Sequence, residues 1–231
     1  MESKSHYYPD GDIIIIVNST IFKVHKIILK LTSTVFNDMF TDIKPDNDQN
    51  IPKITLENES DSAFEDLLSF IYPTNYFVID WTNIIEIFRI SDKFMINFCF
   101  DAAENFLENN FSKDPVLALY LSEKYELKEL FKKASKLVLD NFYIHRESPD
   151  FIKLNIKTRL ALIEKHHDYL TVLYVNKNIY IEGKTYQEFF DENSSTAYKS
   201  IYQEGNIIIG NEIRKSQLCY DGCKNFFIEL N

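Results

Sequence analysis

Two apolar runs near the start of the chain are rich in residues that favour β-strands. Residues 13–17 read Ile-Ile-Ile-Ile-Val, and residues 20–24 read Thr-Ile-Phe-Lys-Val. The Asn18-Ser19 pair that separates them is typical of the two-residue turn of a hairpin. The pattern therefore predicts an antiparallel hairpin over residues 13–24.

The spacing of apolar residues changes to a helical period directly after this hairpin. Two short groups repeat at intervals of three and four over residues 27–40. Thr32 or Ser33 can cap the second group, because a short hydroxyl side chain accepts a hydrogen bond from a free N–H at a helix start. We predict two short helices here, and periodicity alone makes the whole segment the first part of an α+β core.

The next hundred residues alternate between polar stretches and helical patterns. Residues 41–50 are rich in Asp and Asn and predict a surface loop. A short strand is expected at 53–56. A helix should follow over 63–71 and end at Tyr72-Pro73, because the residue before a proline is disfavoured in the α conformation.

A second short strand is expected at Asn75–Ile79, with Asp80 as the cap of a helix that starts at Trp81. That helix has two apolar stripes, which is the pattern of a buried helix. Another helix is predicted to end near Asn109-Asn110.

A pair of helices is predicted between residues 113 and 147, with Pro115 in a first helical turn. Helical spacing resumes at Ile156, Leu160, Ile163 and His167. The last 60 residues change in character, and strands are expected at Tyr169–Val175 and Ile179–Glu182 around an Asn176-Lys177 turn.

Composition narrows the classes of function. The 231 residues carry a formal net charge of −10 and are 45% hydrophobic, which is enough for a sizeable core. A net acidic chain is repelled by phosphate backbones and anionic lipids, so we expect neither nucleic-acid nor membrane binding. No run approaches 18 apolar residues, and the odd count of three cysteines fits a reducing compartment. We expect a soluble protein of the cytoplasm or the nucleus.

Few residues suggest catalysis or metal binding. Cys219 and Cys223 are spaced like a pair of zinc ligands, with His166-His167 and Cys99 as the other candidates, but two cysteines beside a turn are the favoured interpretation. His25 could be a ligand or a base, yet a structural hydrogen-bonding role is favoured because no partner group lies at a recognisable spacing. We predict no enzyme activity, no metal and no cofactor.

Six pieces of this sequence, taken in order, resemble one family. They are Phe22-Lys23-Val24-His25-Lys26, Ser33-Thr34-Val35-Phe36, Ile54-Thr55-Leu56, Ala63-Phe64-Glu65-Asp66-Leu67-Leu68, Ile71-Tyr72-Pro73-Thr74 and Ser91-Asp92-Lys93-Phe94. Together they resemble a BTB/POZ domain over residues 10–111, similar to those of invertebrate BTB proteins. The segment 119–142 resembles the helices that begin a BACK-type extension.

This resemblance implies an α+β fold, with a small mixed sheet and a helical bundle. The expected domains are BTB/POZ at 10–111, a BACK-like helical extension at 112–147 and an unassigned α+β region at 150–231. The family implies protein interaction, with a homodimer formed through the N-terminal strand and the first helix. Many members also bind the N-terminal region of a cullin and act as substrate adaptors of ubiquitin ligases. The alternative is an oligomerisation scaffold, such as a transcriptional or cytoskeletal regulator, that does not bind cullin.

The resemblance also assigns residues to the two surfaces. The dimer region is expected to involve Asp12, Val24, His25, Lys26, Ile27, Ile28, Leu29 and Ser33. Asp12 could pair with a cation across the dimer or be a plain turn residue, and both alternatives remain open. Whichever of Ile27, Ile28 and Leu29 faces outward is expected in the dimer contact, because the apolar excess exceeds what one face of a monomer needs.

The cullin-facing surface is expected to involve Phe40, Ile43, Asp46 and Phe64. In adaptors the loop carries a hydrophobic residue, any residue and then an acid. Here Ile43-Lys44-Pro45-Asp46 has proline where the acid is expected, and this departure bears on cullin binding but not on dimerisation.

Overall fold

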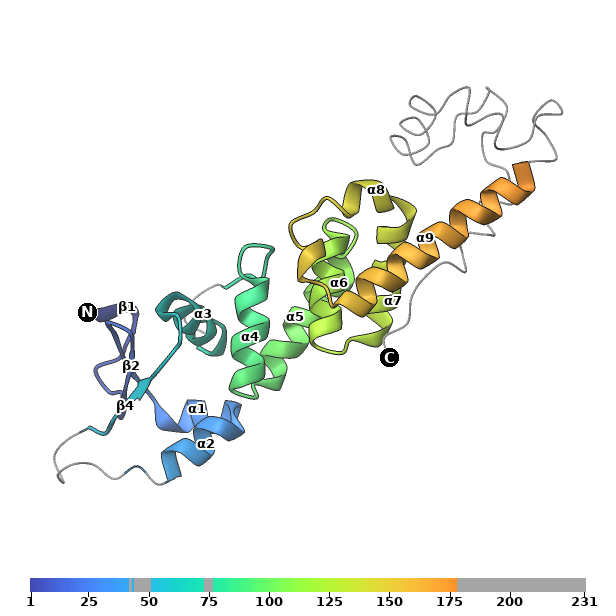
Figure 1. The fold of residues 1–231 in the computed structure, drawn as a ribbon. Helices are drawn as coiled ribbons and strands as arrows, with labels where there is room; N and C mark the ends of the chain where they lie inside the picture. The colour runs from blue at the N-terminus through green and yellow to red at the C-terminus, as the bar shows by residue number, and fades with distance from the viewer. Residues whose placement is uncertain (42, 44–50, 73–76, 178–231) are drawn as a thin grey trace. The chain divides into compact units, whose positions relative to one another are not determined.

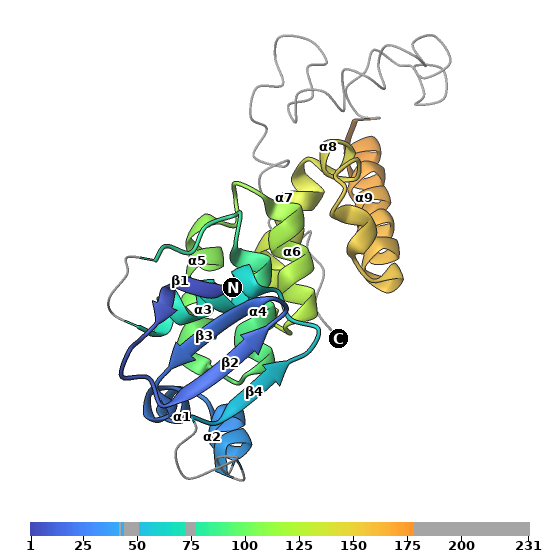
Figure 2. The same cartoon turned by 90° about the vertical axis from the view of Figure 1, so that its left-hand side faces the viewer.

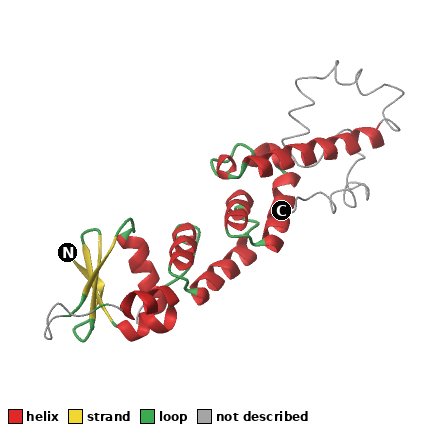
Figure 3. Ribbon diagram, turned by 60° about the horizontal axis from the view of Figure 1, so that its bottom comes forward, coloured by secondary structure: helices red, strands yellow, loops and turns green. Residues whose placement is uncertain are grey.

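The computed structural model describes residues 1–41, 43, 51–72 and 77–177, with the backbone alone for 169–177. The chain divides into two compact units, Met1–Asn109 and Asn110–Asn231. The first is α+β, and the described part of the second contains helices and loops (Figures 1 and 3). The α+β prediction for the first unit is thereby confirmed.

The first unit contains a mixed four-stranded sheet with the order β1-β3-β2-β4 (Figure 2). Its strands are β1 (Glu2–Tyr7), β2 (Ile13–Val17), β3 (Thr20–Val24) and β4 (Lys53–Leu56). β2 is antiparallel to β3 and parallel to β4, while β1 is parallel to β3. The predicted bounds of β2, β3 and β4 are confirmed.

Alternation of side chains explains the hairpin. Ile13, Ile15 and Val17 are fully buried, whereas the residues between them are half-buried at the other face of the sheet. Asn18 adopts a left-handed backbone with φ of 50°, which a tight two-residue turn requires. Its side-chain amide donates to the carbonyl of Glu59 at 2.8 Å, so the turn is fixed to the segment that precedes α3.

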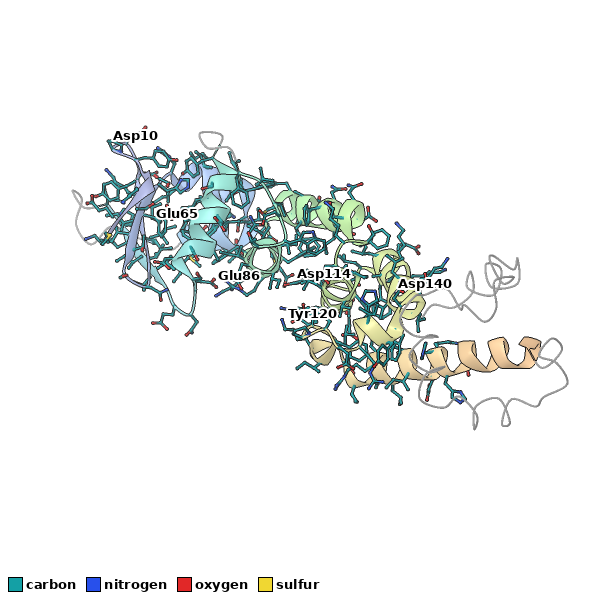
Figure 4. The ribbon with its side chains drawn as sticks, turned by 90° about the horizontal axis from the view of Figure 1, so that it is seen from above. Asp10, Glu65, Glu86, Asp114, Tyr120 and Asp140 are labelled. Carbon is teal, nitrogen blue, oxygen red and sulfur yellow. The ribbon has the colours of Figure 1, made fainter. Side chains whose placement is uncertain are left out.

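Strand β1 was not predicted, because its sequence is polar. Its two buried residues are Ser3 and His6, and both are held by hydrogen bonds to helix α3. The hydroxyl of Ser3 donates to Glu65 at 3.1 Å, and Nε2 of His6 lies 2.9 Å from the hydroxyl of Ser69 (Figure 4 labels Glu65). Polar contacts rather than an apolar alternation therefore attach this edge strand.

The first unit has five helices in its described residues. They are α1 (Lys26–Thr32), α2 (Thr34–Thr41), α3 (Asp61–Ile71), α4 (Ile84–Lys93) and α5 (Asn97–Asn110). Figures 1 and 2 show α3 against one face of the sheet. Buried aromatic rings fill the core between them: Phe36 stacks on Phe94 at 4.6 Å, and Phe22 meets Phe64 edge-on at 5.1 Å.

A buried carboxylate links the segment before α3 to helix α4. The side chain of Glu59 is fully buried and accepts hydrogen bonds from Arg89 at 2.8 and 3.3 Å and from Lys93. Arg89 also pairs with Glu86 at 2.8 Å. Burial alone would raise the pKa of Glu59, but the hydrogen bonds and positive charges of the two cations outweigh it and lower that pKa.

Two local predictions before α4 are wrong. Residues 77–79 form no strand, and the rest of the expected strand at Asn75–Ile79 lies outside the described residues. Helix α4 begins at Ile84 rather than at Trp81. Asp80 instead closes the preceding turn, since its carboxylate accepts from the backbone N–H and the hydroxyl of Thr82 at 2.8 and 2.6 Å.

The described part of the second unit contains four α-helices and one turn of 3₁₀-helix. They are α6 (Pro115–Lys124), α7 (Lys128–Asp140), α8 (Phe142–His145), η1 (Phe151–Lys153) and α9 (Ile156–Lys177). The helix pair expected between 113 and 147 is confirmed, with Pro115 in the first turn and Asp114 as its cap. Asn155 caps α9, because its Oδ1 accepts from the N–H of Lys157 at 3.0 Å. Glu123 on α6 holds this helix start by accepting from the N–H of Asn155 at 2.8 Å and from the hydroxyl of Thr158.

Helix α9 overturns one prediction for the C-terminal region. The expected strand at Tyr169–Val175 and the turn at Asn176-Lys177 lie inside this helix of 22 residues. The aromatic and β-branched residues of that run favour strands by local propensity, but the helix continues through them. The strand expected at Ile179–Glu182 lies outside the described residues.

Candidate self-association surface

The start of helix α1 is fixed by Asp12, the residue that precedes strand β2. Oδ1 of Asp12 accepts from the backbone N–H of Lys26 at 2.7 Å. One of the free donors at the helix start is thereby satisfied, and the carboxylate lies where the helix dipole favours negative charge. Asp12 is thus a remote helix cap within one protomer, a role that neither of the two predicted alternatives included.

His25 joins β3 to α1 and forms hydrogen bonds on three sides. Its backbone N–H donates to the hydroxyl of Tyr72 at 2.9 Å, and Nδ1 lies 3.2 Å from the same oxygen. Nε2 lies 3.3 Å from a carboxylate oxygen of Asp10. The predicted structural hydrogen-bonding role is confirmed.

Aromatic rings hold the end of β1 against this corner. Tyr8 stacks on Tyr72 with centroids 4.9 Å apart and lies 5.2 Å from the ring of His25. Burial raises the pKa of Tyr72 to about 12, so its hydroxyl stays protonated at neutral pH. Burial likewise lowers the pKa of His6, which favours the neutral ring beside Ser69 and Tyr8. The corner is therefore a packed support for α1.

Helix α1 turns two apolar side chains to solvent. Ile27 is 62% exposed and Leu31 is 79% exposed. Their spacing of four residues places both on one face of the helix. Ile27 is thus the outward residue of the predicted Ile27-Ile28-Leu29 run. Leu31 belongs to the same apolar helical repeat as Ile27 in the sequence, but it was not assigned to the dimer region. We call this pair the α1 face.

The other residues assigned to the dimer region lie behind the α1 face. Val24, Leu29 and Ser33 are buried, and Lys26 and Ile28 are half-buried. The hydroxyl of Ser33 donates to the carbonyl of Phe94 at 2.5 Å and accepts from the N–H of Phe36 at 3.0 Å. Of the two predicted caps of α2, Thr32 and Ser33, the structure shows Ser33. These residues shape the surface from inside, and their part in a dimer stays a prediction.

The residues expected to face a cullin are mostly not at the surface. Phe40 is 5% exposed and Phe64 is 0% exposed, because both rings belong to the aromatic core. Their assignment as surface residues is corrected accordingly. Ile43 is half-buried, and Asp46 lies outside the described residues.

No group of three or more metal-ligating side chains gathers within the described part of the chain. Cys219 and Cys223 lie outside it. Cys99 is fully buried, and burial raises the pKa of its thiol to about 12. His166 stacks on Phe142 at 4.5 Å. In the described residues no helix is both long and apolar enough to span a membrane.

Comparison with known proteins identifies the first unit. Residues 6–111 match the family model described as BTB/POZ domain. Residues 6–111 are therefore a BTB/POZ domain, which is a type of interaction module that typically self-associates. It is distantly related to Kelch-like and other BTB proteins.

Three relatives show how distant the relation is. The chain is 28% identical over 146 residues to Kelch-like protein 25 of Rattus norvegicus, which covers 62% of this chain and 24% of that protein. It is 28% identical over 119 residues to BTB and MATH domain-containing protein 36 of Caenorhabditis elegans, covering 52% and 36%. It is 21% identical over 154 residues to Kelch-like protein 41a of Danio rerio, covering 66% and 26%. The chain thus matches about a quarter to a third of these relatives' length.

One solved structure to which this chain is similar is the BTB domain of zebrafish PATZ1. It aligns with a TM-score of 0.36 and 18% identity, over 43% of this chain and 76% of that one.

Proposed function

We propose that the protein is a non-enzymatic adaptor that forms a homodimer through its BTB domain and connects a partner protein to a cullin-type scaffold. The observation that carries the dimer is the exposure of Ile27 and Leu31 on helix α1 of a BTB domain. The BACK-like extension and the region after residue 150 would then hold the partner protein.

Exposed apolar side chains supply the driving force for this dimer. Burying an Ile and a Leu contributes roughly 1.5–3 kcal/mol each when burial is complete, so the four side chains of two α1 faces contribute at most roughly 6–12 kcal/mol before costs. Association itself costs about 4–15 kcal/mol, which can exceed this gain. Other residues near α1 and the edge strand β1 must therefore add to the contact, which agrees with the region that the family resemblance implies.

Light scattering tests the dimer with Ile27→Lys and Leu31→Lys. We expect the unaltered chain to be dimeric or larger and the α1 contact to be lost in both variants, because each places a charge in an apolar contact. Val78→Lys is the matched control, since Val78 is 51% exposed and lies elsewhere on the first unit. A contact through α1 that persists in both α1 variants would refute this dimer.

Calorimetry with a cullin N-terminal domain tests the adaptor role. Binding in the tens of micromolar or tighter is expected for the adaptor, and its absence removes cullin from the proposal while leaving the dimer. The second candidate function, an oligomerisation scaffold without cullin, is favoured by Pro45 at the place of the expected acid in Ile43-Lys44-Pro45-Asp46. This candidate predicts that the protein is a dimer and that calorimetry detects no binding to the cullin N-terminal domain.

A further inference from the structure

Helix α9 carries a second exposed apolar stripe, in the second unit. Ile156, Leu160 and Ile163 are 66%, 54% and 50% exposed, and their spacing of four and three residues places them on one face. The opposite face is the one that packs, since Leu162 is 0% and Thr158 is 9% exposed. Ile152, one turn before the helix, is 71% exposed. We call the three helical residues the α9 stripe.

Two opposite charges lie along one edge of this stripe. Lys157 and Glu164 are both exposed and are seven residues apart, which keeps them on the same side of the helix. They are separated by about 10.5 Å along the axis, too far for a direct ion pair within one helix. Neither side chain has an ion pair with another described residue, whereas Asp168 already lies 3.9 Å from Lys165.

This order of charges is complementary to its own reverse. If a second α9 helix runs antiparallel across a two-fold axis at Leu160, Lys157 of each copy lies beside Glu164 of the other copy. The same axis places the Leu160 residues of the two copies next to each other. It also places Ile156 of each copy beside Ile163 of the other copy. An isologous contact thus satisfies both charges and covers the whole α9 stripe at once.

We propose that the α9 stripe is a second self-association surface, on which two copies of this chain pair through antiparallel α9 helices. The occupant is a second copy because the charge complementarity is symmetric about the centre of the stripe. A lipid surface would instead favour cations along both edges, and Glu164 opposes that. This surface goes beyond the proposed BTB dimer and does not depend on it. Two isologous surfaces on one chain would allow assemblies larger than a dimer.

Sedimentation velocity of the full chain over a range of concentrations tests this surface. In the Ile27→Lys background, we expect a reversible dimer that remains through α9. Leu160→Lys should weaken that dimer at least tenfold, because it places two like charges at the axis. Val78→Lys serves again as the control for an exposed apolar-to-lysine change.

A charge swap separates pairing from simple loss of folding. Lys157→Glu and Glu164→Lys should each weaken the α9 dimer about tenfold, because each turns two attractions into repulsions. The double variant should recover most of the loss. These positions are exposed, so circular dichroism should stay unchanged in all three.

The outcomes for the two surfaces are distinguishable. If Ile27→Lys leaves the mass of the unaltered chain intact and Leu160→Lys alone gives monomers, the α1 contact fails and the α9 contact stands. If Leu160→Lys has no effect on association in either background, or if the double swap is no better than the single changes, the α9 pairing is overturned. A Leu160→Lys chain that loses helix without any change in mass also overturns it, since the stripe is then covered within one chain.

Discussion

Glu59 in the first unit and Glu123 in the second are carboxylates that join segments far apart in the sequence. Glu59 is fully buried and neutralised by Arg89 and Lys93. Glu123 is half-buried and binds the N–H of Asn155 and a neighbouring hydroxyl. The first unit thus depends on an ion-pair network inside its core, and the second on a hydrogen-bonded carboxylate near its surface, at the start of α9. Single changes should therefore cost more stability in the first unit than in the second.

Removal of the Glu59 carboxylate should have the largest effect. Glu59→Ala leaves a cavity and removes the carboxylate that pairs with Arg89 and Lys93. We expect the free energy of unfolding of the first unit to fall by about 3 kcal/mol. Trp81 is the sole tryptophan and lies in this unit, so its fluorescence during urea unfolding reports the change. The exposed Glu57→Ala is the control, with a change below about 0.5 kcal/mol. Equal effects of the two variants would contradict a structural role for this network.

Loss of the Ser33 hydroxyl should come next. Ser33→Ala removes the cap of α2 and leaves the buried carbonyl of Phe94 without this donor, so we expect a loss of about 2 kcal/mol. The same fluorescence measurement applies. Thr34→Ala, one residue later and exposed, should change stability by less than about 0.5 kcal/mol. A Ser33→Ala variant with nearly unchanged stability would show that the sheet and the aromatic core hold α2 without its cap.

The contact of Glu123 with the start of α9 should contribute less to stability. Glu123→Gln keeps the shape of the side chain but removes the charge that favours a helix start, and we expect a loss of about 1 kcal/mol in the opening of α9. Hydrogen exchange of the amides at the start of α9 measures it. Glu129→Gln on α7, which is exposed, is the control. If Glu123→Gln costs as much as Glu59→Ala, the contrast between the two units is wrong.

Acid should weaken the second unit through His166. Burial, and then the positive charge of Arg146, lower the pKa of His166 to about 4. The unfolded chain therefore binds the proton first, and stability falls as the pH drops from about 6.5 toward 4. Allowing for partial exposure, we expect a loss of about 1 kcal/mol between pH 7 and pH 5.

His166→Phe should remove most of this pH dependence while keeping a ring against Phe142. Urea unfolding followed by circular dichroism at the two pH values measures it, with the exposed His167→Phe as the control. An unchanged pH dependence in His166→Phe would assign the loss to another group, such as His145, whose pKa burial also lowers.

Apolar periodicity was sufficient to predict most of the first unit. The runs at 13–17, 20–24 and 53–56 became strands with the predicted bounds, because each has one buried face. β1 escaped prediction because Ser3 and His6 are buried through hydrogen bonds to α3, and such contacts leave no apolar pattern in the sequence.

The candidate site was only partly predictable. The sequence indicated that one residue of 27–29 faces outward, but it could not show that Ile27 is that residue. The role of Asp12 depends on the three-dimensional approach of two segments, which spacing in the sequence does not reveal. In α9, local preference favoured a strand, and the helix that formed overrides it.

The reaction rate of the buried Cys99 thiol can measure how fast the first unit opens. A side chain that is 0% exposed and has a pKa near 12 hardly reacts with thiol reagents while the unit is closed. In a chain with Cys219→Ser and Cys223→Ser, the rate of labelling at saturating reagent would equal the rate at which helix α5 is uncovered. Labelling at low protein concentration would then show whether dissociation of the proposed dimer speeds that opening.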